Sequence, residues 1–230
     1  MSSALVQRKN PKKPRKAKNI KTVTAIQAQK KNSKRCSVFL DNEFAFGVHQ
    51  DVLLKSGISK GDQLSEEQIE AITALEDVHR AKQKAYKLLA VRARSEKELR
   101  DRLVRDQIPE KVIDTVINDL KTLGMLNDQE FALMFARSRM ITRPEGAFLL
   151  RRELYEKGIN KAFIDTAVDQ VFAEKSETDW AFEVAAKRKR QIGHPDDIKT
   201  RKKVSDFLQR RGFHWDIVRE IMDRWNELDN

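Results

Sequence analysis

The side chains that most often carry out chemistry are few in this chain and lie far apart in the sequence. The four histidines, at positions 49, 79, 194 and 214, form no His-x₃-His or Glu-x-x-His pair that would bind a metal. Cys36 is the only cysteine, and in its apolar surroundings it is most simply a small core residue. No glycine-rich phosphate-binding loop occurs. We therefore predict no metal and no cofactor.

Two pairs of adjacent carboxylates are the remaining candidates for acid–base chemistry. Glu66-Glu67 and Asp196-Asp197 both fall at the start of a predicted helix, where the helix dipole favours negative charge. That position already accounts for them. No serine or threonine has a nearby base in a recognised pattern. We therefore predict that the chain is not an enzyme and acts by binding.

Basic side chains point to what it binds, and their distribution matters more than the net charge of +11. Residues 1–35 hold twelve of the 46 Lys and Arg and no acidic residue, so the remaining chain is almost neutral. Basic residues still cluster in three places within it, and residues 187–211 contain ten of them against three aspartates. The candidate contacts are Arg92, Arg94, Arg100, Arg102, Arg137, Arg139, Arg143, Arg151, Arg152, Lys187, Arg188, Lys189, Arg190, Lys199, Arg201, Lys202, Lys203, Arg210 and Arg211.

Any one of these side chains is most simply part of a solvated helix face. Taken together, the recurring clusters favour contact with a polyanion or an acidic protein surface. Nothing in their spacing singles out one helix for base-specific recognition.

The elements that would position these clusters come from an internal repeat. Six apolar positions recur at offsets of 51 and 105 residues without a gap. They are Leu99, Leu103, Ile108, Ile113, Ile117 and Leu120; Leu150, Leu154, Ile159, Ile164, Val168 and Val171; and Val204, Leu208, Phe213, Val218, Met222 and Trp225. The i, i+4 and i, i+7 spacings each place apolar side chains on one face of a helix.

This register predicts three tandem three-helix repeats, at 79–127, 128–177 and 178–230, with first helices at about 79–92, 128–141 and 178–190. Because a single unit cannot bury its own apolar faces, neighbouring units must stack, and we expect a mainly α, elongated and curved body. Glycines 124, 158 and 212 should end helices in the left-handed conformation.

The N-terminal part differs in character. Residues 1–22 are rich in Lys, Arg and Pro and are predicted to be a disordered basic tail. Residues 23–78 predict a small β-hairpin plus helices, with alternating apolar residues on both sides of a turn at 41–43. A short helix at 50–55 should cover the sheet, and a capping box at Ser65 should open a helix over 66–75.

Four segments of the repeat resemble the RecX family, regulators of the bacterial RecA recombinase. RSEKELRDRL at 94–103 is similar to the family's R-x-S-x-x-E-L-x-x-K-L opening, and LGMLNDQEFA at 123–132 to its G-(Y/L)-(L/I)-(D/N)-D-x-x-(F/Y)-A signature. RRELYEKGI at 151–159 and FLQRRGF at 207–213 resemble its later segments. Asn127 stands where the family often has Asp. The tail and the hairpin lie outside this resemblance.

The single cysteine and the lack of a signal-peptide apolar run predict a cytoplasmic protein, and we expect a monomer. The resemblance implies a modulator that binds RecA filaments on single-stranded DNA, in the filament groove. There it would restrain ATP hydrolysis, strand exchange and filament growth, within DNA repair, recombination and the SOS response. The expected partners are the RecA filament and single-stranded DNA, with weaker binding to duplex DNA. The alternative is a stand-alone helical DNA-binding protein that acts without RecA. No stretch approaches the 18 apolar residues of a membrane span, so we expect no membrane partner.

Overall fold

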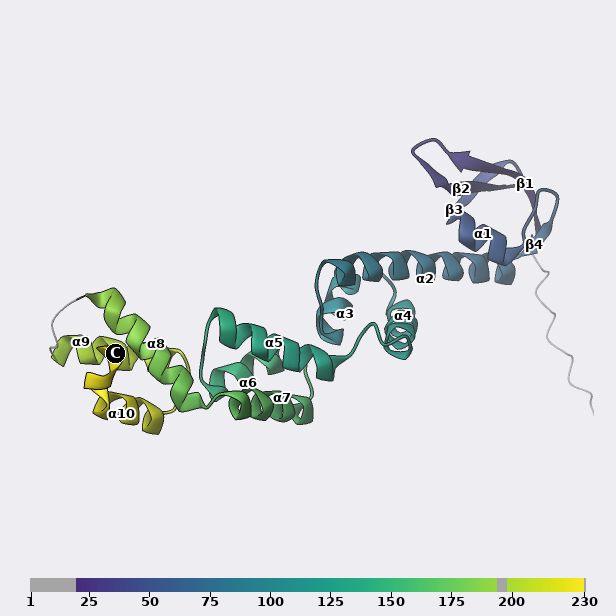
Figure 1. The fold of residues 1–230 in the computed structure, drawn as a ribbon. Coiled ribbons are helices and arrows are strands. Elements are labelled where there is room, and N and C mark those ends of the chain that lie inside the picture. Colours follow the sequence, from purple (N-terminus) through teal and green to yellow (C-terminus); the bar gives the residue numbers. More distant parts are fainter. Residues whose placement is uncertain (1–19, 194–197, 230) are drawn as a thin grey trace, which may run out of the picture. The chain divides into compact units, whose positions relative to one another are not determined.

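A computed structural model describes residues 20–193 and 198–229 of the chain (Figure 1). The chain forms two compact units, Met1–Arg80 and Ala81–Asn230. Residues 1–19 of the predicted basic tail lie outside the described residues, as do His194 and the Asp196-Asp197 pair. The boundary at residue 22 is wrong, because Ile20, Lys21 and Thr22 already belong to a strand. They pair with a short strand near residue 64 that the sequence analysis did not foresee.

The first unit contains a four-stranded antiparallel sheet of order β3-β2-β1-β4. Its strands are β1 (Ile20–Gln29), β2 (Asn32–Leu40), β3 (Glu43–His49) and β4 (Gln63–Ser65). The predicted hairpin is β2–β3, and its turn consists of Asp41 and Asn42, whose φ angles are 50° and 70°. Such positive φ angles suit the right-handed twist of a two-residue hairpin, and Asn and Asp tolerate them.

Helix α1 (Gln50–Ser56) provides cover for this sheet, as predicted. It ends at Gly57, whose φ of 64° is the left-handed conformation that a glycine adopts readily. Val52 from this helix packs with Val38 and Val48 from the strands, and Cys36 is buried beside them as a core residue.

Helix α2 (Glu66–Val91) is one continuous helix, whereas the sequence analysis divided it into helices at 66–75 and 79–92. Residues 76–78 contain neither glycine nor proline, so nothing interrupts the backbone hydrogen bonds there. The predicted capping box opens it: Gln68 N–H donates to Ser65 Oγ and Ser65 N–H donates to Gln68 Oε1. Its last turns form the first helix of the first repeat.

The second unit contains the three predicted three-helix repeats. The first is completed by α3 (Glu96–Arg105) and α4 (Glu110–Thr122). The second consists of α5 (Asp128–Thr142), α6 (Ala147–Glu156) and α7 (Lys161–Glu174). The third consists of α8 (Glu177–Ile192), α9 (Ile198–Arg210) and α10 (Trp215–Asp223), followed by the short 3₁₀ helix η1 (Trp225–Asp229). The glycines predicted to follow helices all have positive φ angles.

The apolar positions that defined the repeat form its core. Every one of the predicted positions is buried except Met222, which is half-buried. Its neighbour Ile221 is fully buried, and the equivalent residues Val116 and Ala167 are buried as well. The apolar stripe of each third helix is therefore one residue wider than the sequence analysis proposed. Within the described residues, no helix is long and apolar enough to cross a membrane.

Candidate binding surface

The junction between the first and second repeats is built from two hydrogen bonds at the start of α3. Ser95 Oγ donates to the carbonyl oxygen of Lys157 over 2.7 Å, and Glu96 N–H donates to Asp128 Oδ1 over 2.8 Å. Ser95 also caps α3, because its Oγ accepts from Glu98 N–H. The backbone N–H groups at the start of a helix have no hydrogen-bond partner within that helix. The next repeat thus supplies a partner for one of them at the start of α3.

The junction between the second and third repeats uses the equivalent positions. Gly146 N–H donates to the carbonyl oxygen of Arg211 over 2.8 Å, and Ala147 N–H donates to Glu177 Oε1 over 2.9 Å. Gly146 corresponds to Ser95, and Arg211 to Lys157. The backbones approach so closely that a Cβ atom on Gly146 would lie 2.0 Å from the carbonyl oxygen of Gly212.

The arginines of the first predicted cluster are held by groups of their own repeat. Arg92 pairs with Glu98 at 2.8 Å, and Arg100 pairs with Asp114 at 2.8 Å and also with Glu110. Arg102 lies 3.6 Å from Asp106. The Nε of Arg94 donates to the carbonyl oxygen of Leu88. The side chains of this cluster are therefore held by contacts within the protein itself.

The second cluster is similar, with one exception. Acidic partners engage Arg137 (Glu174), Arg139 (Glu145 and Glu153), Arg151 (Asp165 and Asp169) and Arg152 (Glu156). Arg143 is exposed, and its side chain makes neither a hydrogen bond nor an ion pair among the described residues.

The third cluster combines buried and available cations. Lys189 donates to Asp229 and to the carbonyl oxygen of Trp225, and its side chain is only 10% exposed. Arg201 lies over the Trp225 ring at 5.3 Å, and Arg188 and Arg211 lie over the Phe207 ring at 5.1 and 4.9 Å. Exposed basic side chains with no hydrogen bond or ion pair in the part of the chain that the structure describes are Lys187, Arg190, Lys199, Lys202, Lys203 and Arg210.

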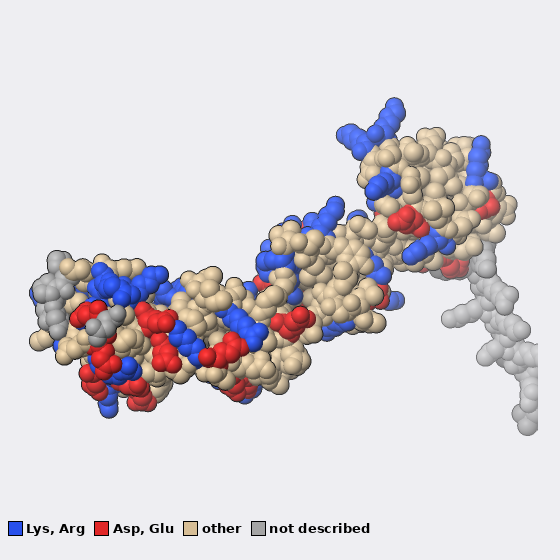
Figure 2. Space-filling view, in the orientation of Figure 1, with Lys and Arg blue, Asp and Glu red and all other residues tan. Residues whose placement is uncertain are grey.

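Figure 2 shows the consequence on one face of the molecule: Lys and Arg side chains lie beside Asp and Glu over the helices of the third repeat. On this face the basic side chains are therefore interrupted by acidic ones. Among the described residues, the side chains of seven candidate cations, Arg143 and the six of the third repeat, have no hydrogen bond or ion pair that an anionic partner would have to displace.

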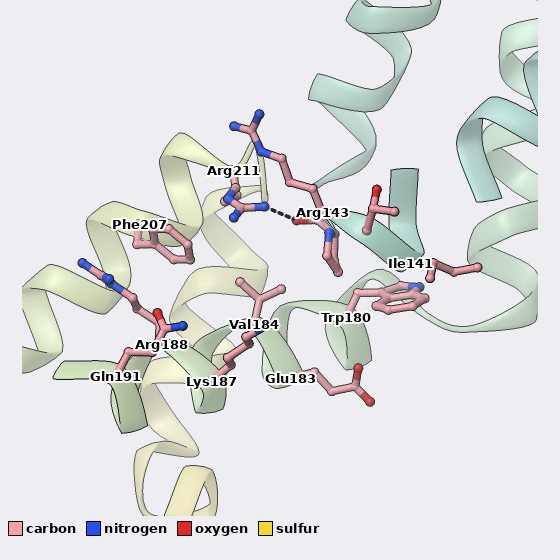
Figure 3. A pocket seen from close by; sticks show the side chains of 12 residues that line it. Ile141, Arg143, Trp180, Glu183, Val184, Lys187, Arg188, Gln191, Phe207 and Arg211 are labelled. Carbon is pink, nitrogen blue, oxygen red and sulfur yellow. Dashed lines mark hydrogen bonds between the residues drawn. The ribbon is translucent and has the colours of Figure 1, made fainter. Parts of the chain in front are cut away.

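A cavity of about 350 Å³ lies between the second and third repeats, and Arg143, Arg188 and Arg211 from the predicted clusters contribute to its lining (Figure 3). Arg143, Lys187, Arg188 and Arg211 line it together with Trp180 and Phe207. Burial lowers the pKa of Arg211, and the positive charge of Arg143 lowers it further. Arg211 donates to the carbonyl oxygen of Pro144 over 3.1 Å. The sequence identified these four basic residues as candidates, but it did not predict that they line one cavity.

A pair of histidines in the first unit was missed altogether. The rings of His49 and His79 stack with their centroids 4.3 Å apart, and Asp51 lies beside them. The two ring planes lie at 26° to each other, and one possible ligand atom from each of His49, Asp51 and His79 lies within 4.8 Å of the other two. Burial and the neighbouring His49 lower the pKa of His79. The residues lie 30 positions apart, on different elements, so no sequence spacing could have revealed them.

The fold defines a tandem-repeat protein of three-helix units, and basic side chains are dispersed over the surface of its helices. Models of four RecX domains match the chain: the N-terminal domain at 21–65, and the first, second and third three-helix domains at 81–120, 127–168 and 176–222. The chain belongs to the RecX family of regulatory proteins. The N-terminal match also shows that the sheet, which we had placed outside the resemblance, is part of the family's own architecture.

Relatives and solved structures agree over most of the chain. The regulatory protein RecX of Bacillus velezensis is 34% identical over 90% of this chain and 78% of its own length. That of Clostridioides difficile is 28% identical over 90% of this chain and 97% of its own. A crystal structure of regulatory protein RecX superposes with a TM-score of 0.68, at 27% identity, over 88% of this chain and 99% of that one. The crystal structure of RecX from Lactobacillus salivarius superposes with a TM-score of 0.58, at 25% identity, over 66% of this chain and 98% of that one.

Proposed function

We propose that this chain is a mainly negative regulator of RecA. In this proposal it binds RecA filaments on single-stranded DNA, in the filament groove, and restrains ATP hydrolysis, strand exchange and filament growth. The observation that carries the proposal is its membership of the RecX family over all three repeats and the N-terminal sheet. Because RecA acts in the cytoplasm, the proposal places this chain there too.

The unpaired cations support a partner that is itself acidic. The side chains of Arg143 and of Lys187, Arg190, Lys199, Lys202, Lys203 and Arg210 make no hydrogen bond or ion pair among the described residues. They can therefore bind phosphates or carboxylates without losing such a contact. The paired arginines of the first repeat would have to give up such contacts first. We therefore assign the principal contacts to the third repeat and to Arg143.

The test is the rate of ATP hydrolysis by RecA on single-stranded DNA, measured with increasing amounts of the full chain. We expect the rate to fall, and we expect the double charge reversal Lys202→Glu/Lys203→Glu to weaken this effect. The matched control is Arg151→Glu/Arg152→Glu, whose arginines already have acidic partners. An unchanged rate at concentrations where direct binding is saturated would refute RecA regulation.

The second candidate is a protein that binds DNA without RecA. The basic excess of residues 1–35 favours it, because such a segment attracts DNA through counterion release without any specific fold. Under this alternative, affinity for naked DNA would match affinity for the filament, and RecA ATP hydrolysis would fall only in proportion to the DNA that the protein covers.

A further inference from the structure

We propose that the cavity between the second and third repeats binds a phosphate group of single-stranded nucleic acid. This proposal rests on the proposed function for its biological setting. It deepens that function because it assigns the binding of the DNA backbone to one place on the chain. Its chemistry can nevertheless be tested without RecA.

The cavity collects positive charge from three separate segments. Arg143 comes from the connection between α5 and α6, Lys187 and Arg188 from α8, and Arg211 from the end of α9 (Figure 3). The only carboxylate among the lining residues is Glu183, and it is paired with Lys175 at 2.5 Å. The cavity therefore carries an excess of positive charge that its own lining does not neutralise.

Two of the cations that line this cavity are exposed and available. The side chains of Arg143 and Lys187 make no hydrogen bond or ion pair among the described residues. An anion with several acceptor oxygens would bind both groups and reduce the mutual repulsion of the cations. Trp180 Nε1 and Arg188 Nε also lack an acceptor within the described part of the chain, but both atoms are shielded from solvent and do not face an anion in the cavity.

The composition of the lining favours a nucleic-acid phosphate over the carboxylate of an acidic protein segment. Guanidinium groups match the geometry of phosphate oxygens, and aromatic and apolar walls beside them suit the base and sugar of a single strand. Trp180 and Ile141, which is 77% exposed, provide such walls. Arg190 follows Lys187 by one helical turn and offers a second cation for the next phosphate.

The experiment compares two double variants of the full chain in binding a fluorescein-labelled oligothymidylate, followed by anisotropy over a series of salt concentrations. Arg143→Gln/Lys187→Gln removes two cations from the cavity. Lys87→Gln/Lys111→Gln removes two exposed cations from the same unit that lie outside the cavity and are not among the candidate contacts. Both change the net charge equally, so long-range attraction falls equally. We expect roughly tenfold weaker binding for the cavity pair, with a smaller salt slope, and less than about threefold for the control.

Three further measurements make the result decisive. The conservative pair Arg143→Lys/Lys187→Arg should retain binding, and thermal unfolding should show that all variants fold. Equal losses for the cavity and control pairs would overturn the proposal. A second outcome would also overturn it: a hexaglutamate peptide binds in a way that depends on Arg143 and Lys187, whereas oligothymidylate binding does not depend on them. The cavity would then bind an acidic protein segment.

The outcome is separable from that of the proposed function. If the cavity variants lose oligothymidylate binding but the natural chain leaves RecA ATP hydrolysis unchanged, RecA regulation fails and the phosphate site stands. If hydrolysis falls while cavity and control variants bind oligothymidylate equally, the phosphate site fails and RecA regulation stands.

Discussion

Glu98 is a single carboxylate that links two repeats. It accepts hydrogen bonds from Arg92 of its own repeat and from Lys157 of the next, each over 2.8 Å. Burial alone would raise the pKa of Glu98, but the hydrogen bonds from these two cations outweigh it and lower the pKa to about 2. The ionised form is thus favoured in the folded protein.

We expect Glu98→Gln to lower the free energy of unfolding by about 1–3 kcal/mol at pH 7, because two charge-assisted hydrogen bonds are weakened. Since the pKa of Glu98 in the folded protein lies below its ordinary value of 4.5, this stabilisation is complete above pH 4.5 and is lost as the pH falls toward 2. Urea unfolding at several pH values measures it, and the difference between natural chain and variant should shrink in acid.

The control for this variant is Glu174→Gln, which removes an ion pair with Arg137 whose side chains are both about half exposed. Solvent screens such a pair, and we expect a loss below about 1 kcal/mol. Equal losses for the two variants would show that Glu98 does not connect the repeats.

At the same scale, Ser95-Glu96-Lys97-Glu98 has the spacing of a capping box, in which the Glu98 carboxylate accepts from the backbone N–H of Ser95. In the structure this carboxylate instead contacts Arg92 and Lys157, and Ser95 Oγ donates to the next repeat. Local patterns specify the cap. They contain no information on a partner 59 or 62 residues away, which depends on how the repeats pack.

At the scale of elements, Gly146 controls the distance between the second and third repeats. Its φ of −72° suits any residue, so its lack of a side chain matters only for space. We expect Gly146→Ala to lower the free energy of unfolding by about 3 kcal/mol, because the new methyl group would collide with the backbone of Gly212. Hydrogen exchange should accelerate at residues 144–147 and 211–213.

Gly124→Ala is the matched control. Gly124 has a φ of 67°, and no atom lies within 4 Å of an added Cβ, so only backbone strain of about 1 kcal/mol is expected. If the two substitutions destabilise the chain equally, and exchange at the junction is unchanged, close approach at Gly146 is not what positions the repeats.

The elements themselves were largely predictable, because the apolar spacing of each helix reports the face that it buries. The errors have physical causes. Strand β4 has one buried apolar residue, Leu64, in three residues, too short for an alternating pattern. Helix α2 was divided at residues 76–78, where Glu76 interrupts the apolar pattern; in the folded unit its carboxylate accepts from Arg35 and from the backbone of His49.

At the scale of the whole molecule, charge is distributed unevenly along the chain. Residues 1–19 contain seven Lys and Arg and no acidic residue. We expect deletion of these residues, which leaves β1 intact, to weaken binding to naked single-stranded DNA. The slope of the logarithm of the binding constant against the logarithm of the salt concentration should become shallower by about 0.7 for each phosphate contact that is lost. Inhibition of RecA should be mostly retained. Loss of inhibition with the tail would move the active surface to the N-terminus.

The net charge of the folded part was predictable from counting, but the availability of its cations was not. Arg100 and Arg151 looked like binding residues because their acidic partners, Asp114 and Asp169, lie 14 and 18 residues away on another helix. Arg143 and Lys187 belong to different repeats and come together only through the junction.

The two junctions follow one plan but are not interchangeable. The first repeat offers Ser95 and Glu96 and the third offers Arg211 and Glu177, which are the same roles that the middle copy fills on its two sides. Excising the middle copy would put Ser95 in the place of Gly146, where a Cβ atom meets the backbone of Gly212. The glycine of the middle copy therefore fixes the order of the copies, because a repeat with a side chain at this position does not fit directly against the third.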